Sequence, residues 1–266
     1  MSTESCCPKD SWPALQGCCY VPKGEVRVDK KEGEKDMEVY VVGTAEEGKA
    51  VLVLPDIFGI DGGRNKHVAD QLAQAGFLVV MPDYFLGDFF PIADSAEFGS
   101  KGPEWAARFP YEAHRAPLRR ALDLIAALGV PSKVVTIGFC WGCWVSFHAG
   151  ADEEFRGRIR GAVDCHPSLK LEEWIWKKSI DDLARAARPG FPHLLLSAAN
   201  DPDFVREGGS VIGILNEAPG SKSRVVDFPG ASHGWVNRGN IKADNVKRDV
   251  KRAIELAIAF YDEVLQ

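Results

Sequence analysis

The chain has 266 residues, a formal net charge of −6, and a composition that is 45% hydrophobic and 26% charged, as in ordinary globular proteins. Its sequence pI is near 5.6, so it lacks the basic surface that phosphate backbones require, and we expect no nucleic-acid partner. No run approaches the roughly 20 apolar residues of a membrane helix. Residues 1–7 lack the basic and apolar regions of a signal peptide. We therefore expect a cytoplasmic protein that is not bound to membranes.

The seven cysteines are an odd number and fit a reducing compartment better than a disulfide framework. Four of them form two adjacent pairs, Cys6–Cys7 and Cys18–Cys19. Metal sites usually have two to four residues between cysteines, and neighbours in an extended chain point to opposite sides. We therefore favour free thiols over a metal site at these pairs, and no other feature requires a metal or a cofactor.

Residues 1–24, rich in Cys, Pro and Gly, predict an irregular lead-in, and residues 25–266 predict one domain. From residue 50 onward, short apolar runs alternate with stretches of helical spacing. A helix that contains Val68 and Leu72 ends at Gly76, and another begins at Pro117 and ends before Gly129. The predicted strands cover 50–55, 77–83, 134–138, 161–165, 193–198 and 224–228, and two more helices begin near Trp141 and cover 245–264.

This alternation predicts an α/β fold with a mostly parallel sheet and helices on both faces. In such a sheet the functional groups gather at the carboxyl ends of the strands. We therefore expect the functional residues to follow the ends of the predicted strands.

The segment Gly138-Phe139-Cys140-Trp141-Gly142 joins a predicted strand to a predicted helix. It has the G-x-nucleophile-x-G pattern of the hydrolase elbow, with cysteine in the place of serine. The turn is so tight that larger side chains two positions from the nucleophile would collide with the strand and helix. The helix N-terminus favours a thiolate. Cys140 is therefore the candidate nucleophile, although a buried structural cysteine gives the same pattern.

A rival interpretation uses the same residues. Cys140 and Cys143 have the Cys-x-x-Cys spacing of a thioredoxin-type redox pair. A thioredoxin-like unit is much smaller than this chain, and it leaves the residues further along unexplained.

An acid and a histidine follow the nucleophile in the order used by α/β-hydrolases. Asp201 lies just past the strand at 193–198, and His233 lies in a glycine-flanked loop after the last strand. Asp203 competes with Asp201 for the role of the acid, and we favour Asp201.

The other histidines are less suitable as the base. His67 and His148 fall within helices from which neither reaches Cys140. His166 lies at the end of the strand at 161–165 and is a candidate for substrate contact.

The loop Asp56-Ile57-Phe58-Gly59 follows the strand at 50–55, where this fold supplies one N–H of the oxyanion hole. We expect the N–H groups of Ile57 and Trp141 to be the two donors. A carboxylate near a cysteine disfavours the thiolate, so Asp56 is either a gate that keeps the thiol protonated or a plain turn residue.

With these segments, the chain resembles the dienelactone hydrolase (carboxymethylenebutenolidase) family over about residues 20–265. The loop at 56–59, the elbow at 138–142, Met81-Pro82-Asp83-Tyr84-Phe85, Asn200-Asp201 and His233-Gly234-Trp235 carry the resemblance. The resemblance implies an α/β-hydrolase fold and a triad of Cys140, Asp201 and His233.

Two positions depart from the bacterial family pattern. Asp56 stands where the bacterial enzymes have the longer Glu, which puts the thiol gate in doubt. The bacterial enzymes bind a substrate carboxylate with arginines, and Arg238 is the candidate here. The N-terminal cysteines and His166-Pro167-Ser168 are similar to the eukaryotic members. The candidate substrate-binding or gating residues are thus Asp56, Phe58, His166 and Arg238.

These features predict a hydrolase that cleaves a lactone or activated ester through a thioester on Cys140. The alternatives are an acyltransferase with the same triad, a thiol-redox protein, and a silent hydrolase-like binding module. The intact triad disfavours the last. We expect a small-molecule ester or lactone as the partner, and a monomer or homodimer.

Overall fold

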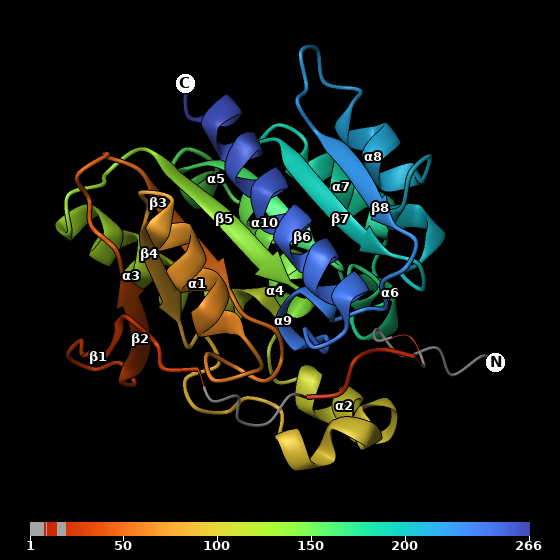
Figure 1. The fold of residues 1–266 in the computed structure, drawn as a ribbon, viewed down its shortest axis with the longest axis horizontal. Helices are drawn as coiled ribbons and strands as arrows, with labels where there is room; N and C mark the ends of the chain where they lie inside the picture. Colours follow the sequence, from red (N-terminus) through yellow and green to blue (C-terminus); the bar gives the residue numbers. More distant parts are fainter. Residues whose placement is uncertain (1–7, 9, 15–19) are drawn as a thin grey trace.

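The computed structural model describes residue 8, residues 10–14 and residues 20–266. Its centre is an eight-stranded sheet with the order β1-β2-β4-β3-β5-β6-β7-β8 (Figure 1). The six strands from β4 to β8 run parallel, whereas β2 is antiparallel to both of its neighbours. The predicted mostly parallel α/β fold is confirmed. The strands are β1 (Glu25–Asp29), β2 (Met37–Val42), β3 (Ala50–Leu54), β4 (Leu78–Pro82), β5 (Val134–Phe139), β6 (Ile159–Cys165), β7 (His193–Ala198) and β8 (Arg224–Phe228).

Helices cover both faces of the sheet, and each face has its own core. Alternate residues of β3 serve the two cores: Val51 and Val53 face the core under α1 and α10, and Leu52 and Leu54 face the other. In Figure 1, α1 and α10 lie in front of the sheet and α4 and α7 behind it. The helices are α1 (Asn65–Gln74), α2 (Phe98–Ala106), α3 (Tyr111–Ala127), α4 (Trp141–Ala151), α5 (Glu153–Arg156), α6 (Leu171–Trp174), α7 (Ile180–Ala187), α8 (Ser210–Leu215), α9 (Trp235–Arg238) and α10 (Asp244–Val264), with 3-10 turns η1 (Ile92–Glu97) and η2 (Asp203–Val205).

The predicted strands and helices are all present, and the predictions for β7 and β8 have the observed bounds. The start of α3 was predicted wrongly, because this helix begins at Tyr111 and Pro117 lies inside it. The apolar spacing begins only at Leu118, since the earlier turns of α3 carry mostly polar residues.

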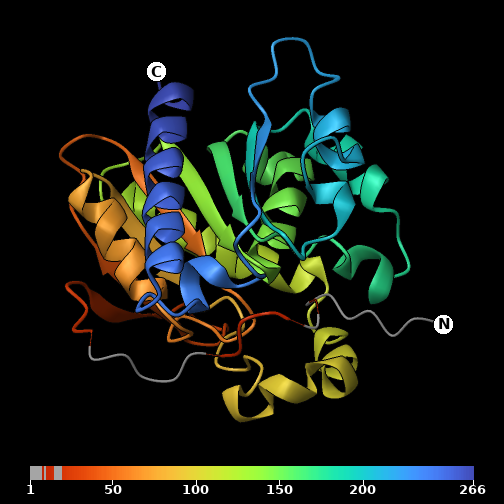
Figure 2. The same cartoon turned by 45° about the vertical axis from the view of Figure 1, so that its right-hand side comes forward.

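The sequence pattern did not predict β1, β2 or α2. β1 is exposed along nearly its whole length and alternates charged residues with valine, so it lacks the buried apolar run that marks β3. Helix α2 contains three residues that disfavour helices, two glycines and Pro103. It projects from the body at the end of the sheet where the parallel strands terminate (Figures 1 and 2).

Part of the predicted lead-in contacts the domain. Its described residues, 8, 10–14 and 20–24, contain neither helix nor strand. The N–H of Trp12 donates to the carbonyl of His233 at 2.8 Å, and the carbonyl of Trp12 accepts from the Arg238 guanidinium. The cysteine pairs at 6–7 and 18–19 lie outside the described residues. No helix in the described part of the chain combines the length and apolar character needed to cross a bilayer.

Candidate active site

Cys140 lies in the turn between β5 and α4, with a backbone conformation that few non-glycine residues adopt. Its φ is 55° and its ψ is −108°, and such a conformation costs of order 1–3 kcal/mol. The flanking glycines are required sterically. A Cβ at Gly138 would lie 2.8 Å from the Cys143 nitrogen, and one at Gly142 would lie 2.0 Å from the Leu54 carbonyl oxygen. The turn therefore has the strained geometry that the sequence predicts for an elbow.

The loop after β6 is tied to this elbow. The N–H of Cys140 donates to the Cys165 carbonyl at 3.2 Å, and the N–H of Ser168 donates to the Cys140 carbonyl at 3.2 Å. The Cys140 sulfur lies 3.1 Å from the Ser168 hydroxyl oxygen. The sequence predicts no role for Ser168, since no motif marks a serine after this strand.

The predicted acid and base meet at the carboxyl ends of β7 and β8. Oδ1 of Asp201 lies 2.6 Å from Nδ1 of His233, and both side chains are buried. Oδ2 of Asp201 accepts from the Ala198 N–H at 2.6 Å. The N–H of His233 donates to the Asn200 side chain at 2.7 Å. The backbone thus holds the Asp201 side chain, and the Asn200 side chain holds the main chain of His233.

The imidazole of His233 is set up to carry a proton. Burial by itself would lower its pKa, but the Asp201 carboxylate, followed by the Cys140 sulfur, outweighs burial and raises the pKa to about 9. Nε2 of His233 makes no hydrogen bond of ordinary geometry to any described residue. The sulfur therefore acts on the ring mainly through its charge, and Nε2 is available for proton exchange.

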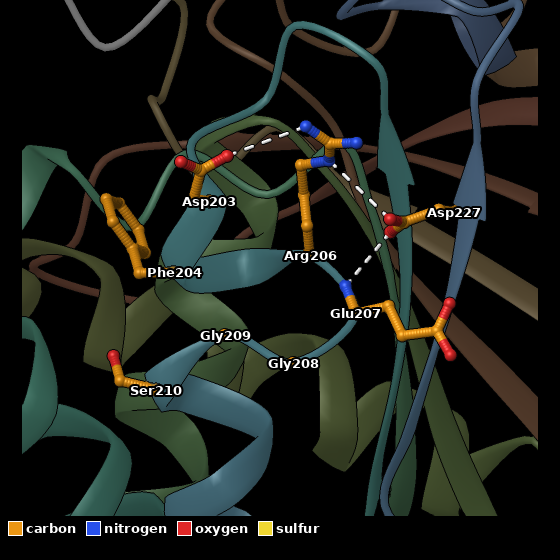
Figure 3. Close-up of a pocket in the computed structure, with 8 residues that line it drawn as sticks. All are labelled: Asp203, Phe204, Arg206, Glu207, Gly208, Gly209, Ser210 and Asp227. Atoms are coloured by element: carbon orange, nitrogen blue, oxygen red, sulfur yellow. Dashed lines mark hydrogen bonds and ion pairs between the residues drawn. The ribbon is translucent and has the colours of Figure 1, made fainter.

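Asp203 lies away from this pair. Its side chain is fully exposed and points toward Arg206, with 3.5 Å between the charged atoms. Both residues line a surface hollow of about 380 Å³ together with Asp227. Figure 3 shows these three side chains and the contacts of Arg206. Of the two candidate acids, only Asp201 contacts His233.

The sequence predicts an oxyanion hole from two backbone N–H groups, those of Trp141 and Ile57. Trp141 is the first residue of α4, so its N–H has no acceptor within the helix. Ile57 lies in the loop after β3, and its carbonyl accepts from the Phe90 N–H at 2.8 Å. No hydrogen bond joins the N–H of Ile57 to another described residue. Both donors therefore stay predictions that the loop geometry allows.

Asp56 is fully buried and is engaged within the protein. It accepts from the Phe58 N–H at 3.1 Å and from the Asn237 amide at 2.8 Å. Its Oδ2 also lies 3.1 Å from Nε of Arg238, whose guanidinium is 5.3 Å from the centre of the Phe58 ring. The carboxylate predicted to gate the thiol is therefore paired with the arginine predicted to bind substrate.

His166 lies beside His233, with 4.9 Å between the ring centroids. Its backbone has a φ of 44° and its side chain is fully buried. Burial, followed by the positive charges of His233 and Arg238, lowers its pKa well below 6.5, so the ring is neutral. The structure thus places His166 next to the candidate base.

Cys143 has a different environment from Cys140. Its sulfur is fully buried and donates to the Cys165 carbonyl at 3.3 Å. Burial, followed by the charge of Asp164, raises its pKa well above that of a free thiol. A resolving thiol in a redox pair needs access and thiolate character, so this environment gives the rival redox interpretation no support.

The remaining candidates lie outside the site. His148 contacts Glu172 at 2.9 Å, and His67 stacks on Tyr20. Both engage other partners, as expected from their places in helices. No group of His, Cys, Asp and Glu within the described ranges could hold a metal ion.

Comparison with known proteins identifies the family. Residues 37–265 match the model of the Dienelactone hydrolase family. The chain belongs to the dienelactone hydrolase family. Among its relatives, Hydrolase tropI of Talaromyces stipitatus is 26% identical and covers 94% of this chain and 97% of its own length. The Carboxymethylenebutenolidase homolog of Rattus norvegicus is 26% identical over 73% of each chain.

Solved structures share the fold of this dienelactone hydrolase family member. A crystal structure of a candidate dienelactone hydrolase from Klebsiella pneumoniae has a TM-score of 0.69 at 20% identity, over 91% of this chain and 99% of that chain. The resemblance predicted from the sequence is confirmed, and with it a hydrolytic enzyme that acts on esters.

Proposed function

We propose that this member of the dienelactone hydrolase family cleaves a small ester or lactone with Cys140 as nucleophile, through a thioester on its sulfur. One observation carries the proposal. Asp201 lies 2.6 Å from one nitrogen of His233, and the Cys140 sulfur helps to raise the pKa of the same ring. A base oriented by an acid and coupled to a nucleophile is the arrangement that acyl transfer requires.

The first half-reaction begins with the thiolate of Cys140 and the imidazolium of His233. The sulfur attacks the carbonyl carbon, and the carbonyl oxygen becomes an oxyanion. The N–H groups of Ile57 and Trp141 stabilise this oxyanion, each by roughly 3 kcal/mol. The C–O bond then breaks, and His233 gives its proton to the departing oxygen.

The second half-reaction returns the enzyme to its starting state. His233, now neutral and oriented by Asp201, takes a proton from water while the water oxygen attacks the thioester carbon. The C–S bond breaks, the acid product leaves, and the thiolate–imidazolium pair is restored. Water thus resolves the thioester in this scheme, whereas an acyltransferase would use another nucleophile.

The leaving group limits the substrate class. A thiolate leaves a tetrahedral intermediate more easily than an amine does, so attack on an amide mostly reverses. An alkoxide or enolate of an activated ester or lactone competes better. Cys140 and His233 are each 1% exposed, which favours a compact substrate. We therefore propose small activated esters and lactones, and not peptides.

The charge balance beside the site limits the substrate further. Asp56 already neutralises Arg238 at 3.1 Å, so a substrate carboxylate at Arg238 would have to compete with it. We propose that Phe58, over which the guanidinium lies, and the neutral ring of His166 contact an uncharged acyl group. A cytoplasmic location and a monomeric or homodimeric state stay predictions.

Burst kinetics on a 4-nitrophenyl ester test the proposal. The wild-type protein should release one equivalent of nitrophenol rapidly, and mass spectrometry should find the acyl group on Cys140. Cys140→Ala should abolish both the burst and the adduct. A burst that survives this substitution would sink the proposed mechanism.

Cys143→Ser is the matched control. Cys143 lies three residues from Cys140, and a serine there can still donate to the Cys165 carbonyl. The burst should survive this change, whereas a redox cycle built on the two cysteines would not.

A further inference from the structure

The hydroxyl of Ser168 is a polar side-chain group that lies directly against the nucleophile. Its oxygen lies 3.1 Å from the Cys140 sulfur, and both residues are 1% exposed. No other hydrogen bond joins this hydroxyl to the described residues. Its role is therefore tied to the sulfur.

The main chain fixes this contact. The N–H of Ser168 donates to the Cys140 carbonyl, and the N–H of Cys140 donates to the Cys165 carbonyl, each at 3.2 Å. The carbonyl of Ser168 accepts from the Leu171 N–H at the start of α6. Because both segments are anchored, the distance between hydroxyl and sulfur does not depend on a mobile loop.

A buried thiolate loses the solvation of water and needs donors in its place. A hydroxyl can accept from a neutral thiol or donate to a thiolate, and the hydrogen bond to the charged form is the stronger of the two. We propose that Ser168 is a positioning residue for the nucleophile: its hydroxyl donates to the Cys140 sulfur and favours thiolate over thiol. This inference rests on the proposed function, in which Cys140 attacks the ester.

Other titratable groups surround the elbow, and the test must separate Ser168 from them. They are His233 from the loop after β8, its neighbour His166 from the loop after β6, Tyr84 from the loop after β4, and Cys143 from α4, with Asp201 behind His233 and Asp56 near Tyr84. A substitution at Ser168 leaves all of these in place and removes one neutral donor.

The hydrogen bond belongs to the resting enzyme and weakens once the sulfur bonds to carbon, because a thioester sulfur is a poor acceptor. Loss of the hydroxyl should therefore lower kcat/KM where the thiolate is scarce. It should leave the plateau at higher pH unchanged or slightly raised. A residue that only fills space would lower activity equally at every pH.

The experiment is the pH dependence of Cys140 alkylation by iodoacetamide, followed by peptide mass spectrometry with fragment ions that separate Cys140 from Cys143. Ser168→Ala should move the midpoint upward by about one pH unit, a tenfold change in the thiol–thiolate equilibrium. Ser168→Thr, which keeps a hydroxyl, should return the midpoint most of the way to its wild-type value. If Ser168→Ala does not fold, Ser168→Gly serves as a second variant without a hydroxyl.

Ser146→Ala is the matched control, because this serine is also buried and its hydroxyl lies 3.3 Å from that of Thr136 in the interior. The midpoint should not move in this variant. An unchanged midpoint in Ser168→Ala, within about 0.3 pH unit, overturns the role of Ser168. That outcome differs from failure of the proposed function, because alkylation needs no ester and a burst surviving in Cys140→Ala would be found separately.

Discussion

Replacement of Asp201 by Asn tests the centre of the proposed mechanism. The carboxylate lies 2.6 Å from Nδ1 of His233 and is the main reason that the pKa of this histidine is raised from 6.5 to about 9. That rise corresponds to about 3 kcal/mol in favour of the imidazolium, or roughly a hundredfold in rate if the transition state depends on it. An asparagine can also donate to Nδ1, which would force the wrong ring tautomer. We therefore expect kcat/KM to fall by about 10³- to 10⁴-fold.

Asp203→Asn is the control for this change. Asp203 lies two residues away, is exposed and pairs with Arg206, so its neutralisation should change kcat/KM by less than about twofold. Steady-state hydrolysis of a 4-nitrophenyl ester at pH 7 gives both numbers. The reasoning would be refuted if the two variants lost activity equally, or if Asp201→Asn kept a tenth of the wild-type rate.

Three further outcomes follow from the structure. Gly142→Ala would place a Cβ 2.0 Å from a β3 carbonyl and should lower the free energy of unfolding by about 3 kcal/mol. Gly157→Ala, with open space at that point, should have a free energy of unfolding within about 0.5 kcal/mol of wild type, as measured by urea denaturation. The raised pKa of His233 stabilises the fold fully below pH 6.5, and this contribution is lost as pH rises through about 9. Between pH 6 and pH 10, the free energy of unfolding of the wild-type protein should therefore fall by up to about 3 kcal/mol relative to that of His233→Gln. Asp56→Asn should remove the negative charge that pairs with Arg238 and lower the free energy of unfolding by about 3–5 kcal/mol. It should also favour esters that carry a carboxylate. An unchanged preference between charged and neutral esters would contradict the proposed charge balance.

The sequence predicted the elements whose signals are local and strong. The buried strand β3 is a continuous apolar run, and β5 and β7 are mostly apolar. The elbow glycines are spaced by a steric requirement that the structure reproduces. The order of Cys140, Asp201 and His233 also predicted which side chains meet, because parallel strands bring their carboxyl ends to one edge.

The remainder depended on contacts that no local pattern encodes. The exposed strand β1 forms because β2 offers it an edge to pair with, and its sequence shows no buried face. Asp56 and Arg238 are 182 residues apart, and only the fold shows that they neutralise each other. The placement of Ser168 against the sulfur likewise follows from how the loop after β6 bonds to the elbow.

Because Trp12 forms hydrogen bonds with His233 and Arg238, the loop that carries His233 depends on a segment from the N-terminal part of the chain. Trp12 bonds the carbonyl of His233 and the guanidinium of Arg238 through main-chain atoms alone, so replacing its side chain matters less than removing the residue. In a protein shortened to begin at residue 20, water would replace both hydrogen bonds. Any change in its activity would then reflect the lost contacts of His233 and Arg238 as well as the state of the nucleophile. An affinity tag attached beyond α10 would avoid these contacts, since the C-terminal end of α10 lies at the opposite end of the molecule from α2 (Figure 1).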